Sequence, residues 1–310
     1  MMYLIHLGYL GYDQDAQTAF IPNEEIRQEL TAATRRNPKN ISVSLRNYNK
    51  NIADKTVLSS RKDENTMKYD FTTQVSRENT GSSKWDGMYA ANPNVPEGTV
   101  PFSVADMEFK NPPQIAEGIG EYLKNSIMGY TFATDAYYDA VIGWMKRRHN
   151  WDIKKEWIVE YPGVVPALYH MVNLFTAPGD GVLLFTPVYY PFYNAVRKGG
   201  RTLAESRLLL TGDHYEIDFA DFEEKAKDPK NKLLLLCSPH NPVGRVWTKE
   251  ELAKIGEICL KNNVMVVADE IHNDLIMPGY EHTVYATVSE EMAQNCIVCT
   301  SPSKTFNMAG

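Results

Sequence analysis

The chain has 310 residues, of which 43% are hydrophobic and 23% charged, so it can bury a full core as one large domain or two ordinary ones. A formal net charge of −7 argues against nucleic acid as a partner, because phosphate binding needs clustered Lys and Arg. No apolar run approaches the roughly 20 residues of a membrane helix and the N-terminus does not resemble a signal peptide, so we expect no membrane partner. The cysteines lie in apolar runs and in one helix pattern, which indicates reduced thiols in a cytoplasmic protein.

Residues 1–66 do not share the pattern of the rest of the chain. Residues 1–30 predict a small helical and hairpin unit. Residues 31–66 are rich in Asn, Lys, Arg, Ser and Thr without a sustained period, which predicts a disordered linker. The stretch GYLGYD followed by IPNEEIR resembles the tail of a bacterial family of ATPase-like proteins with a nuclease-like C-terminal region. We interpret residues 1–66 as an unrelated fused tail; a natural regulatory extension is the alternative.

From residue 100 onward, short apolar runs alternate with helix patterns. The apolar runs predict strands buried on both faces at 157–161, 182–186, 232–237, 264–269 and 296–300. The other patterns predict helices at 112–125, 135–148, 166–175, 191–198, 219–227 and 249–261. The last helix begins with a capping box formed by Thr248 and Glu251. The alternation predicts an α/β fold with a mostly parallel sheet flanked by helices, in which ligands bind at the C-terminal strand ends.

Three of the predicted strands are followed by groups that suit ligand binding. After the first, Gly163 precedes a helix start, where the N–H groups of Gly163, Val164 and Val165 could hold an anion. After the second, Tyr189 belongs to an aromatic group that could stack on a flat ring or simply pack in the core. Asn241 lies between two prolines and cannot continue a strand or helix, so its amide is available for a hydrogen bond.

The last two predicted strands end in charged residues. Asp269 closes an almost purely apolar run, and a buried carboxylate needs a cationic or proton-donating partner. Lys304 follows the last strand, where burial would lower its proton affinity and make the amine a nucleophile; a surface lysine is the alternative. Asp269, Glu270 and His272 do not have a familiar zinc spacing, and the CxxC of residues 296–299 lacks a second pair, so we expect no metal site.

Together these groups match the needs of pyridoxal phosphate, which are a phosphate grip, ring stacking, a partner for the pyridine nitrogen, a contact to the ring hydroxyl and a Schiff-base lysine. A dinucleotide site is the obvious competitor, but no G-x-G-x-x-G follows any predicted strand.

Several motifs resemble one known family. SPHNPVGRVW, VVADEIH and TSPSKTFN are similar to the fold-type I aminotransferase class I/II superfamily, which depends on pyridoxal 5′-phosphate. KWDGM, VPFSVADMEFKNPPQI and GYTFATDAYYDAVIGWMKRRHNW resemble its MalY/PatB branch, the cystathionine β-lyases that cleave carbon–sulfur bonds. The resemblance runs from about residue 68 to residue 310. It implies an N-terminal arm and the start of a small domain at 67–110, and the cofactor-binding large domain of the transferase fold at 111–310.

The resemblance also implies a role for each site residue. Lys304 would form the Schiff base and move the Cα proton, Asp269 would pair with the pyridinium nitrogen, and Tyr130 would reach the cofactor phosphate of a neighbouring subunit in a homodimer. The other residues expected to bind the cofactor are Asn241, His272, Tyr189, Gly163, Val164, Ser301 and Ser303. His272 stands where many aminotransferases have Tyr, which favours the lyase branch.

The activity implied by this resemblance is a C–S β-lyase that turns a sulfur amino acid into pyruvate, ammonia and a thiol. An aminotransferase shares the chemistry up to the carbanion, and a non-catalytic regulatory protein that keeps the fold is the alternative from another class. The family continues beyond the lysine into a small domain with a substrate-binding arginine, so we expect the large domain to be incomplete at the C-terminus and turnover to be impaired.

Overall fold

The computed structural model describes residues 11–13, 18–20, 69–71 and 73–309. Its centre is a five-stranded sheet of order β4-β3-β7-β8-β9, in which every neighbouring pair is parallel. The strands are β3 (Gly181–Thr186), β4 (Thr202–Arg207), β7 (Asn231–Cys237), β8 (Met265–Asp269) and β9 (Cys296–Cys299). The expected α/β fold with a mostly parallel sheet is therefore confirmed.

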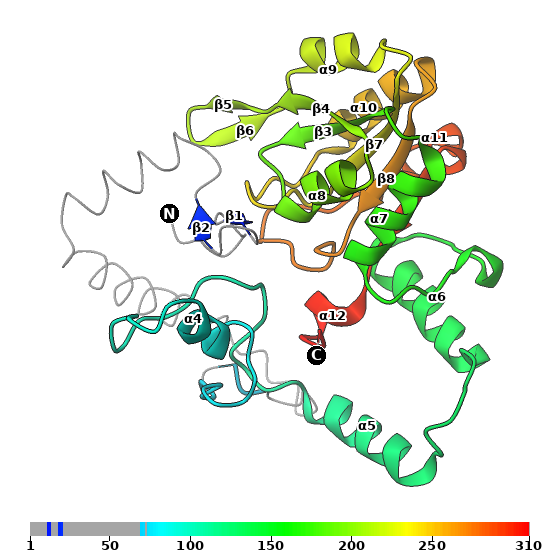
Figure 1. The fold of residues 1–310 in the computed structure, drawn as a ribbon. Helices are drawn as coiled ribbons and strands as arrows, with labels where there is room; N and C mark the ends of the chain where they lie inside the picture. The colour runs from blue at the N-terminus through cyan, green and yellow to red at the C-terminus, as the bar shows by residue number, and fades with distance from the viewer. Residues whose placement is uncertain (1–10, 14–17, 21–68, 72, 310) are drawn as a thin grey trace.

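Helices cover both faces of this sheet (Figure 1). Alternate residues of β7 enter different clusters: Leu233 and Leu235 pack with α7 and α8, whereas Leu234 and Leu236 pack with α9 and α10. These helices are α7 (Val164–Phe175), α8 (Tyr190–Lys198), α9 (Phe219–Ala226) and α10 (Lys249–Lys261). Because both faces are buried, a central strand has no polar face, which explains the unbroken apolar run LLLLC in β7.

The remaining helices lie outside this layered core or at its margin. They are α4 (Trp85–Ala91), α5 (Pro113–Asn125), α6 (Asp135–His149), α11 (Glu290–Gln294) and α12 (Pro302–Thr305). In Figure 1, α5 lies away from the sheet and α12 lies between the strands and the α4 region. Among the described residues, no helix is both long and apolar enough to cross a membrane.

One predicted strand is wrong and three short strands were missed. Residues 157–161 are not a strand, since Trp157 ends a 3-10 turn and Val159 is 81% exposed. An apolar run becomes a strand only where a neighbour supplies hydrogen bonds, and this run has no strand partner among the described residues. The edge strand β4 escaped prediction because its sequence, TLAESR, is half polar. The hairpin of β5 (Leu209–Thr211) and β6 (His214–Glu216) was missed as well.

Only a small part of the N-terminal region is described. β1 (Gly11–Asp13) pairs antiparallel with β2 (Thr18–Phe20). The helices expected at 1–30 and the linker expected at 31–66 lie outside the described residues.

The predicted start of α10 can be tested directly. Thr248 Oγ1 accepts the Glu251 N–H at 3.2 Å, and Glu251 Oε2 accepts the Thr248 N–H at 2.8 Å, which forms the capping box. We predict that Thr248→Ala lowers the free energy of unfolding by about 1 kcal/mol, whereas Thr248→Ser lowers it by much less. Urea unfolding followed by circular dichroism measures both, and equal losses in the two variants would contradict a capping role.

Candidate active site at the strand ends

Three neighbouring strands end at the same level of the sheet. Their last residues, Cys237, Asp269 and Cys299, are paired in register. The hydrogen bonds continue one step further, because the Ser238 N–H donates to the Asp269 carbonyl at 2.9 Å and the Glu270 N–H donates to the Cys299 carbonyl at 2.8 Å. The segments that follow β7, β8 and β9 therefore start side by side at this edge.

Lys304 does not lie at the tip of a strand as expected. β9 ends at Cys299, and Lys304 lies in the short helix α12, which Ser301 caps by accepting the Ser303 N–H at 3.1 Å. The Lys304 side chain is half-buried and its Nζ donates to the Ala105 carbonyl at 3.0 Å. The amine is thus held between the strand ends and the segment that precedes α5.

The electrostatics place Lys304 and Asp269 within reach of each other. Burial lowers the pKa of Lys304, and the carboxylates of Asp106 and Asp269 partly oppose this shift. Burial raises the pKa of Asp269 to about 7, although the Ile271 N–H, which donates to its Oδ1 at 3.2 Å, and the charge of Lys304 both favour the ionised form. The two groups interact electrostatically at this edge of the sheet, where burial lowers the pKa of the lysine and raises that of the carboxyl.

Asn241 and Tyr189 lie together beside this pair. The Tyr189 N–H donates to the Asn241 carbonyl at 2.9 Å. Asn241 is buried, and its Oδ1 has no hydrogen-bond partner among the described residues. Tyr189 is half-buried; burial raises its pKa, and its ring meets Tyr190 edge to face at 5.1 Å between centroids. A buried polar atom without a partner and a half-buried ring next to it suit a bound ligand.

His272 lies near Lys304, whereas Glu270 binds residues of the loop after β8. Burial and, to a lesser extent, the charge of Lys304 lower the pKa of His272 to about 4, so this imidazole is neutral at pH 7. Glu270 accepts the Tyr285 N–H at 2.8 Å, and its other oxygen lies 2.9 Å from His282 Nε2. Glu270 thus supports the loop after β8 instead of joining Asp269.

The start of α7 differs from expectation. The helix begins at Val164, two residues before the predicted start at Pro166, with Gly163 at φ 112° as its cap. Gly163 cannot offer a free N–H, because it donates to the Tyr161 carbonyl at 2.7 Å. The first-turn N–H groups of Val164 and Val165 remain as the anion donors of this helix start. Val164 itself packs in the core cluster that Tyr189 also contacts.

The remaining predicted residues fall into two groups. Ser301 and Ser303 lie beside Lys304, with their hydroxyl oxygens 3.0 Å apart. Tyr130 is fully exposed in the segment between α5 and α6, so this chain alone does not bring it to the strand ends.

Sequence reasoning missed the segment that closes the site from the N-terminal side. Lys84 is almost fully buried and lies 3.1 Å from Asp106 Oδ1 and 2.8 Å from Glu108 Oε1. Next to it, the Met107 N–H donates to Asn307 Oδ1 at 2.9 Å, and Asn307 Nδ2 donates back to the Met107 carbonyl at 3.2 Å. The signal was present in KWDGM and VADMEF, where charges stand among apolar residues, but the contact that joins this segment to the site pairs Met107 with Asn307, 200 residues away in sequence.

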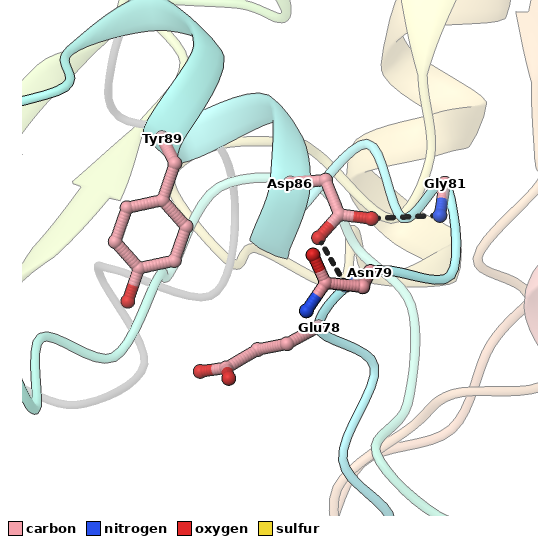
Figure 2. A pocket seen from close by; sticks show the side chains of 5 residues that line it. All are labelled: Glu78, Asn79, Gly81, Asp86 and Tyr89. Carbon is pink, nitrogen blue, oxygen red and sulfur yellow. Dashed lines mark hydrogen bonds between the residues drawn. The ribbon is translucent and has the colours of Figure 1, made fainter.

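A separate hollow lies near α4 and does not belong to this site. It is lined by Glu78, Asn79, Gly81, Asp86 and Tyr89 (Figure 2). The Asp86 carboxylate accepts the N–H groups of Asn79 and Gly81, each at 2.7 Å, and these bonds to the backbone lower its pKa. Asp86 therefore fixes the turn before α4.

Comparison with known proteins agrees with the motifs. The model of the family "Aminotransferase class I and II" matches residues 98–310. The chain belongs to the aminotransferase class I and II family. Within that family it is 44% identical to cystathionine beta-lyase PatB of Bacillus subtilis over 243 residues, which cover 77% of this chain and 62% of PatB. Protein MalY of Escherichia coli is 31% identical over 77% of this chain and 60% of its own length.

Solved structures of this family give the same picture. Cystalysin from Treponema denticola, which contains a pyridoxal 5′-phosphate cofactor, is 55% identical with a TM-score of 0.77 over 79% of this chain and 62% of its own. A pyridoxal-phosphate-bound C–S lyase from Staphylococcus hominis is 33% identical with a TM-score of 0.72 over the same shares of the two chains. The chain thus spans about 62% of the length of these relatives, and the resemblance to the MalY/PatB branch is confirmed.

The raised pKa of Asp269 makes the stability of this aminotransferase-family chain depend on pH. Between its unfolded value of 3.8 and about 7, the carboxyl is protonated only in the folded state, so the folded state binds the extra proton. The contribution of Asp269 to stability therefore falls as the pH rises through this window. We predict that Asp269→Asn, which lacks this titration, is more stable than the unmodified cofactor-free chain by a few kcal/mol at pH 8, and that the difference shrinks toward pH 4.

Urea unfolding of the cofactor-free chain between pH 4 and pH 8 measures this difference. Asp139→Asn, on the exposed side of α6, is the matched control and should run parallel to the unmodified chain. If the stability of Asp269→Asn also changed with pH in parallel with that of the unmodified chain, Asp269 would not be a buried, proton-binding group.

Proposed function

We propose that this chain binds pyridoxal 5′-phosphate and carries the site of a carbon–sulfur β-lyase acting on a sulfur amino acid of the cystathionine type. The observation that carries the proposal is that a half-buried lysine amine and a buried carboxylate interact electrostatically at one edge of a parallel sheet. The names and bound cofactors of the relatives support the same reading.

The residues present fit this cofactor. Asp269 is a buried carboxylate that forms no ion pair within the described part of the chain, and the protonated pyridine nitrogen would supply one. Asn241 has a buried amide with an unpartnered atom, which suits the ring hydroxyl. Tyr189 offers a half-buried ring for stacking, and Lys304 offers an amine of lowered pKa for covalent attachment.

When bound, pyridoxal phosphate supplies an electron sink that makes the Cα proton of an attached amino acid acidic. The Lys304 Nζ would hold the cofactor covalently, and after its release by the substrate the same amine would accept the Cα proton. Asp269 would keep the proton on the ring nitrogen, and burial strengthens that interaction. Val164, Ser301 and Ser303 would contribute phosphate contacts, with Gly163 shaping the turn so that the backbone can approach closely.

His272 completes the proposed site. As a neutral imidazole near Lys304, it adds no second positive charge that would compete with the lysine for Asp269. We assign it a contact with the cofactor and no proton-transfer step.

The rival activity is amino transfer. The relatives also include the aspartate aminotransferase of Bacillus sp. YM-2, 29% identical over 66% of this chain. Both reactions need the same lysine and carboxylate, so the geometry of these residues favours neither. Formation of pyruvate from cystathionine without an added keto acid supports the lyase, whereas keto-acid-dependent formation of a new amino acid supports the transferase.

We predict that the chain takes up pyridoxal phosphate with a visible absorbance band and that sodium borohydride fixes the cofactor on Lys304. Lys304→Ala should lose both signals, because it removes the amine proposed to bind the cofactor, while the nearby amine of Lys84 is already held by Asp106 and Glu108. Lys225→Ala, which removes an amine that pairs with Asp221 on α9, is the matched control and should keep both signals. Spectroscopy and peptide mass spectrometry measure the outcome, and borohydride labelling elsewhere in the unmodified chain would refute the assignment of Lys304.

A second copy of the chain belongs to the proposal. The segment between α5 and α6 exposes large apolar side chains almost completely, namely Ile127, Met128, Tyr130 and Phe132. Such a patch is costly in water, and a second copy that covered it would bring Tyr130 to the phosphate of its neighbour.

We predict that the chain sediments as a dimer and that Tyr130→Ala weakens cofactor affinity by about tenfold while the dimer persists. Mixed dimers of Tyr130→Ala and Lys304→Ala chains should regain one tight site, since one of the two sites then has both residues intact. Tyr280→Ala, another exposed tyrosine, is the control. A monomer with normal cofactor affinity would contradict the shared site.

A further inference from the structure

Asp274 is a buried carboxylate that the roles described above do not use. Its side chain is only 6% exposed. Its Oδ2 accepts hydrogen bonds from Thr305 Oγ1 at 2.8 Å and from Trp144 Nε1 at 3.0 Å, and its Oδ1 lies 3.2 Å from His149 Nε2. These donors come from α12 and α6, so Asp274 joins two helices to the loop that follows β8.

The short helix α12 depends on such support. It has only four residues, and a helix of this length does not hold its shape without tertiary contacts. Besides its Ser301 cap, it is anchored by the Thr305 hydroxyl on Asp274 and by the neighbouring Phe306 ring, which meets Trp144 at 4.9 Å between centroids. Hydrogen bonds of Lys304 to Ala105 and of Asn307 to Met107 hold it from the other side. Thr305 directly follows Lys304, so any rotation of α12 moves the amine.

The contacts of Asp274 also connect, through two histidines, to Glu270, the residue after Asp269. The ring of His149 meets the ring of His282 edge to face at 5.9 Å, and His282 Nε2 lies 2.9 Å from Glu270 Oε2. Both imidazoles are almost fully buried, with 4% and 3% of their side chains exposed. Glu270 follows Asp269 in the chain, so a continuous buried path links the neighbours of Asp269 and Lys304.

The geometry points to Asp274 as a positioning residue that holds α12 through Thr305 and so keeps the Lys304 amine at the strand ends beside Asp269. Its importance for catalysis rests on the function proposed above, but the positioning itself does not require the cofactor. Although burial by itself raises the pKa of Asp274, hydrogen bonds from His149, Thr305 and Trp144 lower it to about 2, so the acceptor is charged at neutral pH. A charged acceptor makes the Thr305 hydrogen bond stronger than a neutral one would be.

The test compares variants that change one hydrogen bond at a time. Thr305→Val removes the hydroxyl and keeps the shape, Thr305→Ser keeps the hydroxyl, and Asp274→Asn removes the charge of the acceptor. Thr287→Val is the matched control, because Thr287 Oγ1 donates to a backbone carbonyl, that of Val284, at 2.8 Å away from α12. Urea unfolding midpoints establish that each variant is folded.

The first measurement needs no cofactor. Brief acetylation with acetic anhydride, followed by mass spectrometry, compares the labelling of Lys304 with that of Lys261, whose side chain is 67% exposed. Loss of the anchor should free Lys304 from the Ala105 carbonyl and raise its relative labelling by about tenfold in Thr305→Val and Asp274→Asn. Thr305→Ser and Thr287→Val should stay within about twofold of the unmodified chain.

The second measurement follows covalent attachment of pyridoxal phosphate by its visible absorbance. Thr305→Val should slow attachment by about tenfold and Thr305→Ser should restore it. If Thr305→Val labels and reacts like the unmodified chain, or if Thr305→Ser is as impaired as Thr305→Val, the positioning role is overturned. If the labelling pattern is as expected but no variant takes up the cofactor, the positioning role stands and the proposed function fails.

Discussion

The structure depends on how a lysine and a carboxylate are kept partly out of water at one edge of a parallel sheet. Burial disfavours the charged forms of both groups, so each stabilises the other only if they remain close. The register of β7, β8 and β9 ends the three strands at one level, so that Asp269 and the start of the segment that carries Lys304 lie at this edge. The helices on both faces keep that register fixed, because a slip of one residue would turn the apolar side chains of β7 into the wrong clusters.

The sheet and most helices could be predicted because their signals are local. The apolar runs of β3, β7, β8 and β9 are distinctive, and α10 begins where its capping box indicates. The prediction of a strand at 157–161 was wrong because strand formation there depends on a contact that is not local. This run has the composition of a strand, but whether a strand forms depends on a partner that no local pattern reveals.

The candidate site was predictable only as a set of side chains, and its geometry was not. Asp269, Asn241 and Lys304 were found from the strand ends, since parallel strands bring their carboxyl ends to one edge. The helical setting of Lys304 in α12 was missed because Ser301, Pro302 and Ser303 read equally well as a loop after the strand. The contacts of Lys304 with Ala105 and of Asn307 with Met107 join residues about 200 positions apart, and no periodicity encodes them.

These long-range contacts explain how a four-residue helix can hold Lys304 in place. Ala105 accepts a hydrogen bond from the lysine, Asn307 exchanges two hydrogen bonds with Met107, and Asp274 binds the side chain of Thr305. Each bond contributes on the order of 1 kcal/mol, so none of them alone outweighs the entropy of ordering the segment. Acting from different sides, they leave α12 a single orientation. A longer helix would be more stable by itself. Its own axis would then set the direction of the Lys304 side chain, whereas in the short helix the contacts with the strand ends set that direction.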